Sequence, residues 1–438
     1  MAKSIEKALE QPTAENPMAA RRPGDRWIWG IYVVLCFVSL VESYSASSQE
    51  VAKYGLYMPM VKHAGLLLFG GVLAVALQNT NYNKFRAWIP MFALFTLCCV
   101  IYVMLFGDII NGARRSFRIY GIGLSVQPSE MAKLSLVTVI AWLMSKMQIP
   151  GGGVKMGAVI VCAGSVLVFG GLLFPQGFTN TAILMAISLA MMLIAGIQFK
   201  RFLIIILVYG GCYCGYKAVS SINKEKEMRV ETTQTGEKKA VEGREGTRSK
   251  RMETFSFFES ECLKHPMNSD YQQEQYGYMA RAHGGLFGVG PGNSRECSRL
   301  PLAFSDYVFS IIVEEVGFVG AIILMILYIS LLGRAGIIAT RCKRAFPALL
   351  ILGMAVMITI QALSHMAINS GLVPVTGQPL PFISKGGSSI LVMSIAMGIM
   401  LSVSRFAEFN SGKKPSASAE RAAEAEGDAI NPSQIIKS

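Results

Sequence analysis

Two adjacent carboxylates, Glu314 and Glu315, stand inside a long apolar run of this chain. They follow Asp306 by about nine residues, which is roughly 12 Å along a helix. If the run spans a membrane, an ionised carboxylate at that depth costs on the order of 3 kcal/mol or more, so it must face a cavity or a partner. Adjacent helical residues point about 100° apart. At most one of the pair therefore faces a binding site squarely, and a structural Glu with a buried partner is the alternative.

Two further acids stand where helices are expected to begin. Asp306 follows Ser305, and Glu130 follows Pro128 with Lys133 one turn later. A hydroxyl or a proline before an acid is ordinary chemistry for the start of a helix, and Glu130 and Lys133 are spaced to form an ion pair. These residues are candidate site residues, with helix initiation as the alternative.

A polar stripe and an arginine cluster complete the short motifs. Gln361, His365 and Asn369 recur every four residues and share one helix face, which suits either contacts between helices or a polar pathway. The second motif comprises Arg114, Arg115 and a third arginine at position 118. Forked guanidinium donors match phosphate, so this cluster predicts an anion site or a collar for lipid headgroups.

The stretch from Val373 to Ser389 contains three prolines, so it cannot be one continuous helix. It lies between two apolar runs, and irregular backbone at membrane depth is tolerated only where it is buried or lines a wet cavity. A re-entrant loop is therefore expected over 370–387. Paired glycines would let backbone donors approach an anion. The candidate residues are Ser384, Lys385, Gly386, Gly387 and Ser388.

Composition predicts the elements that must position these residues. The 438 residues are 52% hydrophobic and 16% charged, against about 25% charged in soluble proteins, so the chain reads as a multi-pass membrane protein. In a soluble protein, its net charge of +13 would suggest nucleic-acid binding. Here the charge comes from short basic runs between apolar segments, which indicate the cytoplasmic side of a membrane protein instead.

About ten apolar segments approach the roughly 20 residues that cross a bilayer. An all-α polytopic transmembrane bundle is thus expected, with spans near 27–45, 58–77, 85–106, 129–144, 154–174, 182–197, 202–218, 306–332, 346–368 and 388–404.

Basic residues in alternate short connections place both termini in the cytoplasm. The expected divisions are a tail over 1–26, seven spans over 27–218, a large extracytoplasmic loop over 219–305, three spans with the re-entrant loop over 306–406, and a tail over 407–438. Cys262 and Cys297 both fall in the large loop, where they either pair in an oxidising compartment or remain free thiols.

The chain resembles the SEDS family (shape, elongation, division and sporulation) of polytopic membrane proteins. The resemblance rests on four stretches in the family's order: Asn111 to Lys133, Tyr271 to Gly292, Leu300 to Gly317 and Asn369 to Ser389. The polar tails and the Gly-rich run from His283 favour the division branch, which is FtsW-like, over the RodA-like elongation branch.

The resemblance implies a peptidoglycan glycosyltransferase that polymerises lipid II outside the bacterial cytoplasmic membrane, at the division site. It also implies a class B penicillin-binding transpeptidase as partner, along with other divisome proteins. The alternatives are a flippase or transporter of lipid-linked precursors, which would need no base in the loop, and a non-catalytic scaffold of the division machinery.

The family places a catalytic Asp before a Pro in the large loop, a few residues before Gly-Tyr-Gln. Counting back from Gln272 reaches His265, whereas counting forward from Arg251 reaches Glu261. The candidate general bases are therefore Glu261, Asp270 and Glu259, with His265 as an outside alternative. A carboxylate would deprotonate the acceptor hydroxyl, which attacks the donor with inversion.

Two other positions depart from the family. Phe174 to Thr181 lacks the acid of the usual Pro-Asp-x-Gly-Thr, and Lys385 replaces a commoner Tyr or Asn. The charge of the leaving lipid pyrophosphate needs cations, for which the chain offers Arg114, Arg115 and Lys385. Asp306, Glu314 and Glu315 would orient these cations or hold a divalent metal, Mg²⁺ or Mn²⁺. No metal ligand can be assigned.

Overall fold

A computed structural model of the chain describes residues 23–45, 57–110, 113–119, 124–149, 153–212, 214–215, 272–300, 303–373 and 377–407. The described helices are α2 (Arg26–Ser45), α4 (Tyr57–Gln78), α5 (Tyr82–Phe106), α6 (Pro128–Lys146), α7 (Met156–Leu173), α8 (Phe178–Ile194), α11 (Gln272–Gly284), α12 (Val308–Arg341), α13 (Ala345–Asn369) and α14 (Gly387–Phe406), with a 3₁₀ turn at Glu296–Ser298 and a further helical stretch over 199–212.

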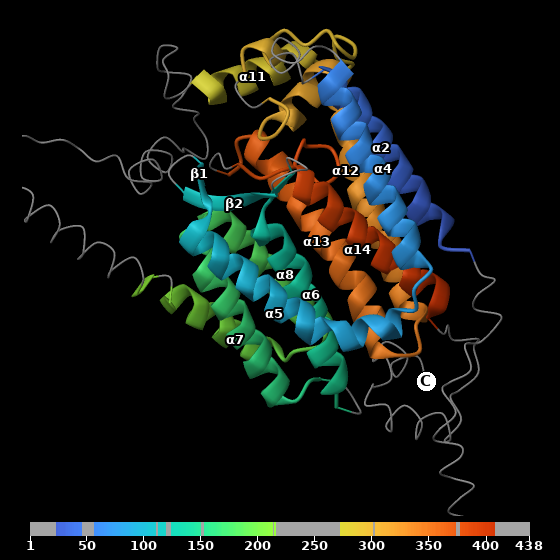
Figure 1. Ribbon diagram of the computed structural model, residues 1–438, viewed down its shortest axis with the longest axis vertical. Helices are drawn as coiled ribbons and strands as arrows, with labels where there is room; N and C mark the ends of the chain where they lie inside the picture. Colours follow the sequence, from blue (N-terminus) through green and yellow to red (C-terminus); the bar gives the residue numbers. More distant parts are fainter. Residues whose placement is uncertain are drawn as a thin grey trace, which may run out of the picture.

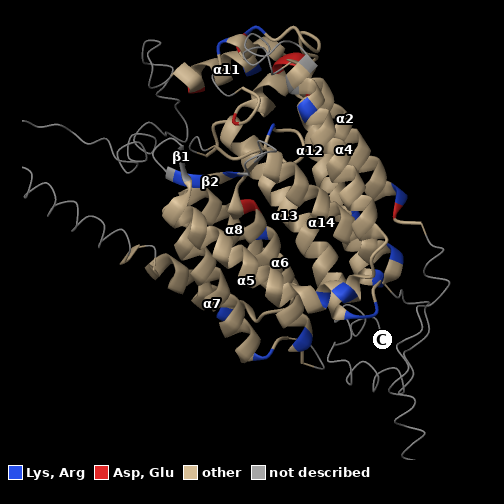
Figure 2. Cartoon of the chain, viewed as in Figure 1, with Lys and Arg blue, Asp and Glu red and all other residues tan. Residues whose placement is uncertain are grey.

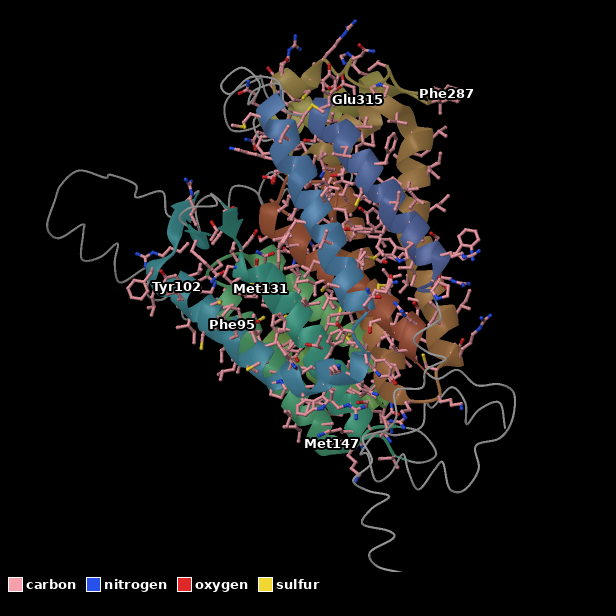
Figure 3. The ribbon with its side chains drawn as sticks, turned by 45° about the vertical axis from the view of Figure 1, so that its right-hand side comes forward. Phe95, Tyr102, Met131, Met147, Phe287 and Glu315 are labelled. Carbon is pink, nitrogen blue, oxygen red and sulfur yellow. The ribbon has the colours of Figure 1, made fainter. Side chains whose placement is uncertain are left out.

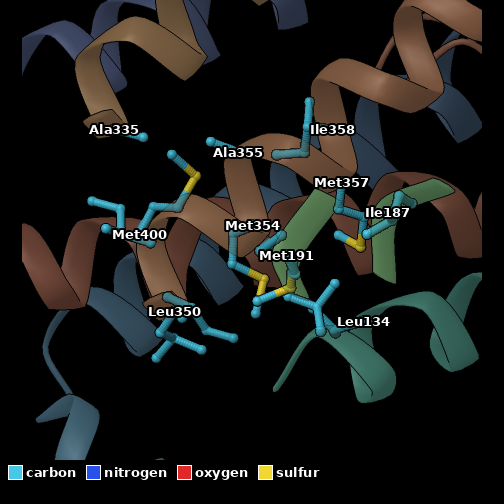
Figure 4. Packing of buried hydrophobic residues seen from close by; sticks show 14 of the residues in the cluster. Leu134, Ile187, Met191, Ala335, Leu350, Met354, Ala355, Met357, Ile358 and Met400 are labelled. Atoms are coloured by element: carbon cyan, nitrogen blue, oxygen red, sulfur yellow. The ribbon is translucent and has the colours of Figure 1, made fainter. Parts of the chain in front are cut away.

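The helices form a bundle with α13 near its centre (Figure 1). On one side α2, α4, α12 and α14 pack together, and on the other α5, α6, α7 and α8 do so, while α13 packs against α6, α8, α12 and α14. Buried side chains from α6, α8, α12, α13 and α14 meet around Met354 and Met357 (Figure 4). Unbranched methionines fill such irregular gaps between helices.

Close helix contact depends on small residues, as is usual inside membranes. A Cβ atom on Gly398 of α14 would lie 2.8 Å from the Leu77 Cβ and 3.0 Å from the Ala74 Cα of α4. Real Cβ atoms do not approach that closely, so glycine is what allows these two helices to touch.

The expected fold class is confirmed, since each predicted span falls on a helix and seven of the described helices are long and apolar enough to cross a membrane. The span at 182–197 falls on α8, a shorter apolar helix, and the span at 202–218 is described only in part. The total of ten spans, the tails and the division boundaries stay predictions.

The structure adds a small antiparallel sheet at the end of the bundle where α11 lies (Figure 1). Its strands are β1 (Asp108–Ile110), β2 (Ala113–Ile119) and β3 (Leu124–Val126), in the order β1-β2-β3. β2 carries the arginine cluster, and successive strand residues point to opposite faces. Arg114 and Arg115 therefore point in different directions.

Candidate active site

The irregular segment over 377–386, which we call the proline loop, is fixed by hydrogen bonds from several helices. The Tyr328 hydroxyl of α12 donates to the Pro381 carbonyl at 2.6 Å, and His365 Nδ1 of α13 lies 2.6 Å from the Gln378 carbonyl. Phe382 is 1% exposed and has a φ of 67°. A left-handed conformation is strained for a non-glycine residue, and such strain persists only where the surroundings impose it.

The end of the proline loop is bonded to the chain just before α12. The Ser384 hydroxyl donates to the Ser305 carbonyl at 2.9 Å and accepts from the Leu380 amide at 2.7 Å. Lys385 donates its amide to the Phe304 carbonyl, and its Nζ lies 5.5 Å from the Phe304 ring centroid. Lys385 is half-buried and precedes the first residue of α14 by two positions, and the amino end of a helix favours anions.

Asp306 lies against the opposite end of the proline loop. Its Oδ1 accepts from the Ser305 hydroxyl at 3.0 Å, and a Cβ on Gly377 would lie 3.0 Å from its Oδ2. Glycine at 377 therefore lets the backbone approach this carboxylate closely. The sequence expectation that Asp306 and the Ser384–Lys385 region act together is consistent with this placement, although their roles stay predictions.

Arg115 reaches the same region through the connection between α7 and α8. Its Nε donates to the Gln176 carbonyl at 3.1 Å, and a turn further along, the Asn180 side chain accepts from Gln378 Nε2 at 2.9 Å. Both residues belong to the stretch that lacks the family's acid. A guanidinium, a buried amide pair and an ammonium thus belong to the proline loop or to the segments that contact it, and we call this set of groups the polar surface.

The polar stripe on α13 links this surface to the interior. Asn369 Nδ2 donates to the Asp306 carbonyl at 3.0 Å and lies 3.2 Å from His365 Nε2, while its Oδ1 accepts from Ser310 at 3.0 Å. His365 donates through Nδ1 and accepts through Nε2, which fixes its neutral tautomer. The histidine therefore positions the loop and has no free nitrogen for proton transfer.

Deeper along the same face lies a buried triad, Glu130, Lys133 and Gln361. Lys133 Nζ lies 2.6 Å from Glu130 Oε1 and 2.8 Å from Gln361 Oε1, and Gln361 Nε2 donates to Glu130 Oε2 at 3.2 Å. Each side chain is at most 1% exposed. Every charge is paired, so the triad closes on itself and joins α6 to α13. The polar face is continuous with the proline loop through His365, one turn further along α13.

Glu314 and Glu315 belong to a separate group at the α11 end, the acidic junction, which also contains Glu42 and Glu296. Glu314 accepts from the Ser294 hydroxyl at 2.5 Å and the Arg295 amide at 3.0 Å, and Glu315 accepts from the Ser45 hydroxyl. All four carboxyl groups are at most 2% exposed. Figure 3 places Glu315 inside the upper end of the bundle.

A kink in α12 at Gly317, where φ is 76° and ψ is −177°, shapes the junction. The segment after α11 pairs with this kink, since the amides of Val289 and Gly290 donate to the Glu314 and Glu315 carbonyls. A Cβ on Gly288 would lie 2.2 Å from the Glu315 carbonyl oxygen. The glycine-rich run of the sequence is therefore the seam that joins α11 to α12.

The remaining predicted site residues do not join this surface. Arg114 is exposed and donates to the Leu105 carbonyl at the end of α5, and Gln272 is exposed at the start of α11 with Nε2 3.4 Å from the Tyr276 hydroxyl. Ser388 accepts from the Gln127 amide at 3.1 Å. The candidate bases Glu259, Glu261 and Asp270, together with His265 and Cys262, lie outside the described residues.

Metal binding finds no support among the residues that the structure describes. No three His, Cys, Asp or Glu side chains in those ranges are grouped so that they could hold an ion. As placed, Asp306 and the acidic junction provide no such group of ligands among these residues, so a divalent metal stays a prediction from the sequence.

Sequence reasoning missed several residues of this surface, chiefly Asn180, Gln176, Gln378 and Tyr328. Asn180 and Gln176 stood in a stretch that differs from its family, but a missing acid does not say which polar group takes its place. Gln378 and Tyr328 are single polar residues in apolar surroundings, and nothing in their spacing separates them from ordinary buried polar groups.

Comparison with known proteins places the chain in a family. The model of the FtsW, RodA and SpoVE proteins, described as "Cell cycle protein", matches residues 25–409. The chain is 28% identical to the probable peptidoglycan glycosyltransferase FtsW of Bacillus subtilis over 394 residues, which cover 87% of this chain and 91% of that protein. It is 30% identical to the protein of the same name from Trichlorobacter lovleyi over 380 residues, with 85% and 91% covered.

Solved structures share the fold. The rod shape determining protein RodA of Thermus thermophilus matches with a TM-score of 0.59 at 22% identity, over 88% of this chain and 98% of that one. A chain from a structure titled as a peptidoglycan synthase complex that coordinates polymerization and crosslinking matches with a TM-score of 0.63 at 22% identity, over 87% and 98%. Since the family model and relatives of nearly full length agree, the chain belongs to the SEDS family, on its FtsW-like branch.

Proposed function

We propose that this chain is a peptidoglycan glycosyltransferase that polymerises lipid II into glycan strands during cell division. The observation that carries the proposal is the match, over most of both chains, to relatives whose names state the activity. The polar surface around the proline loop supports it, because it gathers Arg115, Lys385 and Asp306 at one end of a membrane bundle, where a lipid-linked anion would present its headgroup.

In the proposed reaction a carboxylate of the large loop, Glu259, Glu261 or Asp270, removes the proton from the acceptor sugar hydroxyl. The hydroxyl oxygen forms the new bond to the anomeric carbon from the face opposite the leaving group. The bond from that carbon to the pyrophosphate oxygen breaks, and the electron pair leaves with the lipid pyrophosphate, giving inversion. Arg115 and Lys385 stabilise the charge that grows on the leaving group.

The other predicted binding residues act as supports in this scheme. Asp306 orients the Lys385 ammonium, and Ser384 fixes the loop backbone. The Gly386 amide already donates to the Ser384 carbonyl, so the Gly387 amide at the start of α14 is the one that adds a donor for phosphate. Arg114 is the less favoured of the two arginines, because its guanidinium is bound to the end of α5. A divalent metal, Mg²⁺ or Mn²⁺, stays a proposal from sequence alone.

The orientation of the chain follows from its charges. Lysines and arginines gather at the connections α4–α5 and α12–α13, at the end of the bundle opposite α11 and the sheet (Figure 2). The Asp25 amide before α2 donates to the Ser404 hydroxyl near the end of α14 at 3.1 Å, so both described ends of the chain lie at that basic face. Basic connections mark the cytoplasm. We therefore propose that both termini lie in the cytoplasm and the proline loop outside. The similarity to FtsW proteins supports a role at the division site.

The proposed partners are a class B penicillin-binding transpeptidase and other divisome proteins. The structural neighbour whose title names a complex for polymerization and crosslinking supports the first of these. A transpeptidase that crosslinks what the transferase polymerises would use the nascent strand at the same membrane face.

The test is polymerisation of fluorescent lipid II by the purified chain with its transpeptidase, whose own active site is blocked. Wild type is compared with Glu259→Gln, Glu261→Gln and Asp270→Asn, each at equal protein level and equal complex formation. Glycan product in the wild type that one substitution abolishes supports the transferase and names its base. Product absent from wild type, under conditions where a related complex forms it, overturns the proposal in favour of a flippase or a scaffold. A flippase would move lipid II in vesicles and tolerate all three substitutions.

A further inference from the structure

Ser39 on α2 and His63 on α4 form a buried pair that contacts the proline loop. Ser39 is fully buried, and His63 is 3% exposed. The Ser39 Oγ lies 2.7 Å from His63 Nε2 and donates to the Phe382 carbonyl at 2.8 Å. A serine hydroxyl has only one proton. Since that proton goes to Phe382, Ser39 must accept from His63, which fixes the donor at Nε2.

The residue that this pair contacts is the strained one. Phe382 has the single positive φ among the described non-glycine residues, at 67°, and its ring is packed edge-on against Tyr32 with centroids 5.4 Å apart. Tyr32 and Ser39 are seven residues apart on α2 and therefore share one helix face. α2 thus holds both the ring and the carbonyl of a conformation that the backbone alone does not favour.

Ser384 and Lys385 follow Phe382 by two and three residues, after Ile383. The Lys385 ammonium is close enough to interact electrostatically with the His63 ring. Any rotation of the Phe382 peptide changes the direction in which the backbone enters Ser384, whose hydroxyl accepts from the Leu380 amide at 2.7 Å and donates to the Ser305 carbonyl at 2.9 Å. The position of the Lys385 ammonium therefore depends on α2 and α4, two helices that are far from it in sequence.

We propose that Ser39 and His63 are positioning residues for glycosyl transfer: they set the conformation of Phe382 and thereby place Lys385 against the leaving pyrophosphate. This rests on the proposed function for the reaction, but not for the geometry. Substitution of Ser39 or His63 should lower kcat more than it changes KM, because the charge of the leaving group develops in the transition state.

The first experiment measures the loop and does not depend on catalysis. In a full-length chain whose nine native cysteines are replaced by Ser or Ala, Lys385→Cys reports loop position through its rate of reaction with a membrane-impermeant maleimide. Adding Ser39→Ala or His63→Leu is expected to change that rate about fivefold or more. Ser188→Ala is the matched control, since Ser188 is 2% exposed and its hydroxyl donates only to Leu184 of its own helix. Equal rates in Ser39→Ala and Ser188→Ala overturn the proposal.

The second experiment uses the native chain and lipid II polymerisation. Ser39→Ala and His63→Leu are expected to lower kcat about tenfold with KM within about threefold. His63→Gln keeps an N–H donor in place of Nε2 and should restore most of the rate. A wild type that labels as expected but makes no polymer counts against the proposed function only. An active wild type with Ser39→Ala, His63→Leu and Ser188→Ala all at its kcat counts against the positioning role.

Discussion

The Glu130–Lys133–Gln361 triad and the acidic junction are both almost fully buried, yet only the triad contains a buried cation. In the triad, each carboxylate oxygen has a donor within 3.2 Å. In the junction, one oxygen each of Glu42, Glu296 and Glu315 has no hydrogen-bond partner in the described part of the chain. Among the described residues, the basic side chains within 4 Å of its carboxylates are Arg299 and His283, which are 56% and 42% exposed.

The difference shows how buried carboxylates serve two regions of one bundle differently. A buried ion pair that is complete costs little to keep but much to break, because removal of one partner leaves the other charged and unpaired. The carboxyl groups of the junction are already buried without a buried cation. Replacing one of them should therefore lower the free energy of unfolding only slightly. The triad is therefore a rigid support for α13, whereas the junction holds the seam between α2, α11 and α12 at some cost in stability.

The largest expected effect comes from opening the triad. Lys133→Met leaves Glu130 buried without its cation and should lower the free energy of unfolding by about 3–5 kcal/mol. Thermal unfolding in detergent, followed by intrinsic fluorescence, measures it. The double variant Lys133→Met with Glu130→Gln should regain most of the lost stability. A single variant as stable as wild type would mean that the triad is not closed.

The acidic junction should respond unevenly. Glu314→Gln removes charge-assisted acceptors for Ser294 and Arg295 and should cost about 1–3 kcal/mol. Glu42→Met replaces a carboxyl group that has an unpartnered oxygen by an apolar side chain of similar volume, and it should leave the unfolding temperature unchanged or raise it. The same thermal assay on both variants checks this contrast. A large loss in Glu42→Met would show that the junction holds an unseen partner, such as a cation.

The smallest effect is expected at the end of the bundle opposite α11, where Asp25 pairs with Arg334 at 2.6 Å and accepts from the amides of Trp27 and Ile28. Burial acts to raise the pKa of Asp25, but the Arg334 guanidinium and these amides outweigh it, so the pKa lies below its ordinary value of 3.8. The stabilisation is therefore present above that ordinary value and is lost as pH falls through the lowered pKa.

Substitutions at Asp25 separate the two contributions. Asp25→Asn keeps an acceptor for the helix amides and loses only the ion pair, about 0.2–1 kcal/mol. Asp25→Ala loses the cap as well, about 1 kcal/mol more. Unfolding temperatures at neutral pH check the order, and a variant Asp25→Asn less stable than Asp25→Ala would contradict it.

The sequence predicted the helical bundle well, because long apolar runs separated by basic connections leave few other folds in a bilayer. The shared face of Gln361, His365 and Asn369 followed from their spacing alone, and all three side chains are buried and hydrogen-bonded. The small sheet was not anticipated, since the arginines of β2 obscure its alternation.

Tertiary partners could not be predicted in the same way. Glu314 and Glu315 read as one pair, but their partners come from α2 and from the segment after α11, which only the fold brings together. Ser39 and His63 are isolated polar residues in apolar runs, and their link to Phe382 spans 343 positions of sequence from Ser39. Spacing along a chain carries no information about such contacts.

The most direct test of the account uses the two neighbouring arginines of β2. Arg115 faces the polar surface through Gln176, and Arg114 faces α5. Initial rates of lipid II polymerisation should fall about 10²- to 10³-fold in Arg115→Gln, as for loss of a donor to a developing charge, and stay within about threefold of wild type in Arg114→Gln. Equal losses in both variants, or a larger loss in Arg114→Gln, would contradict a catalytic surface built around the proline loop.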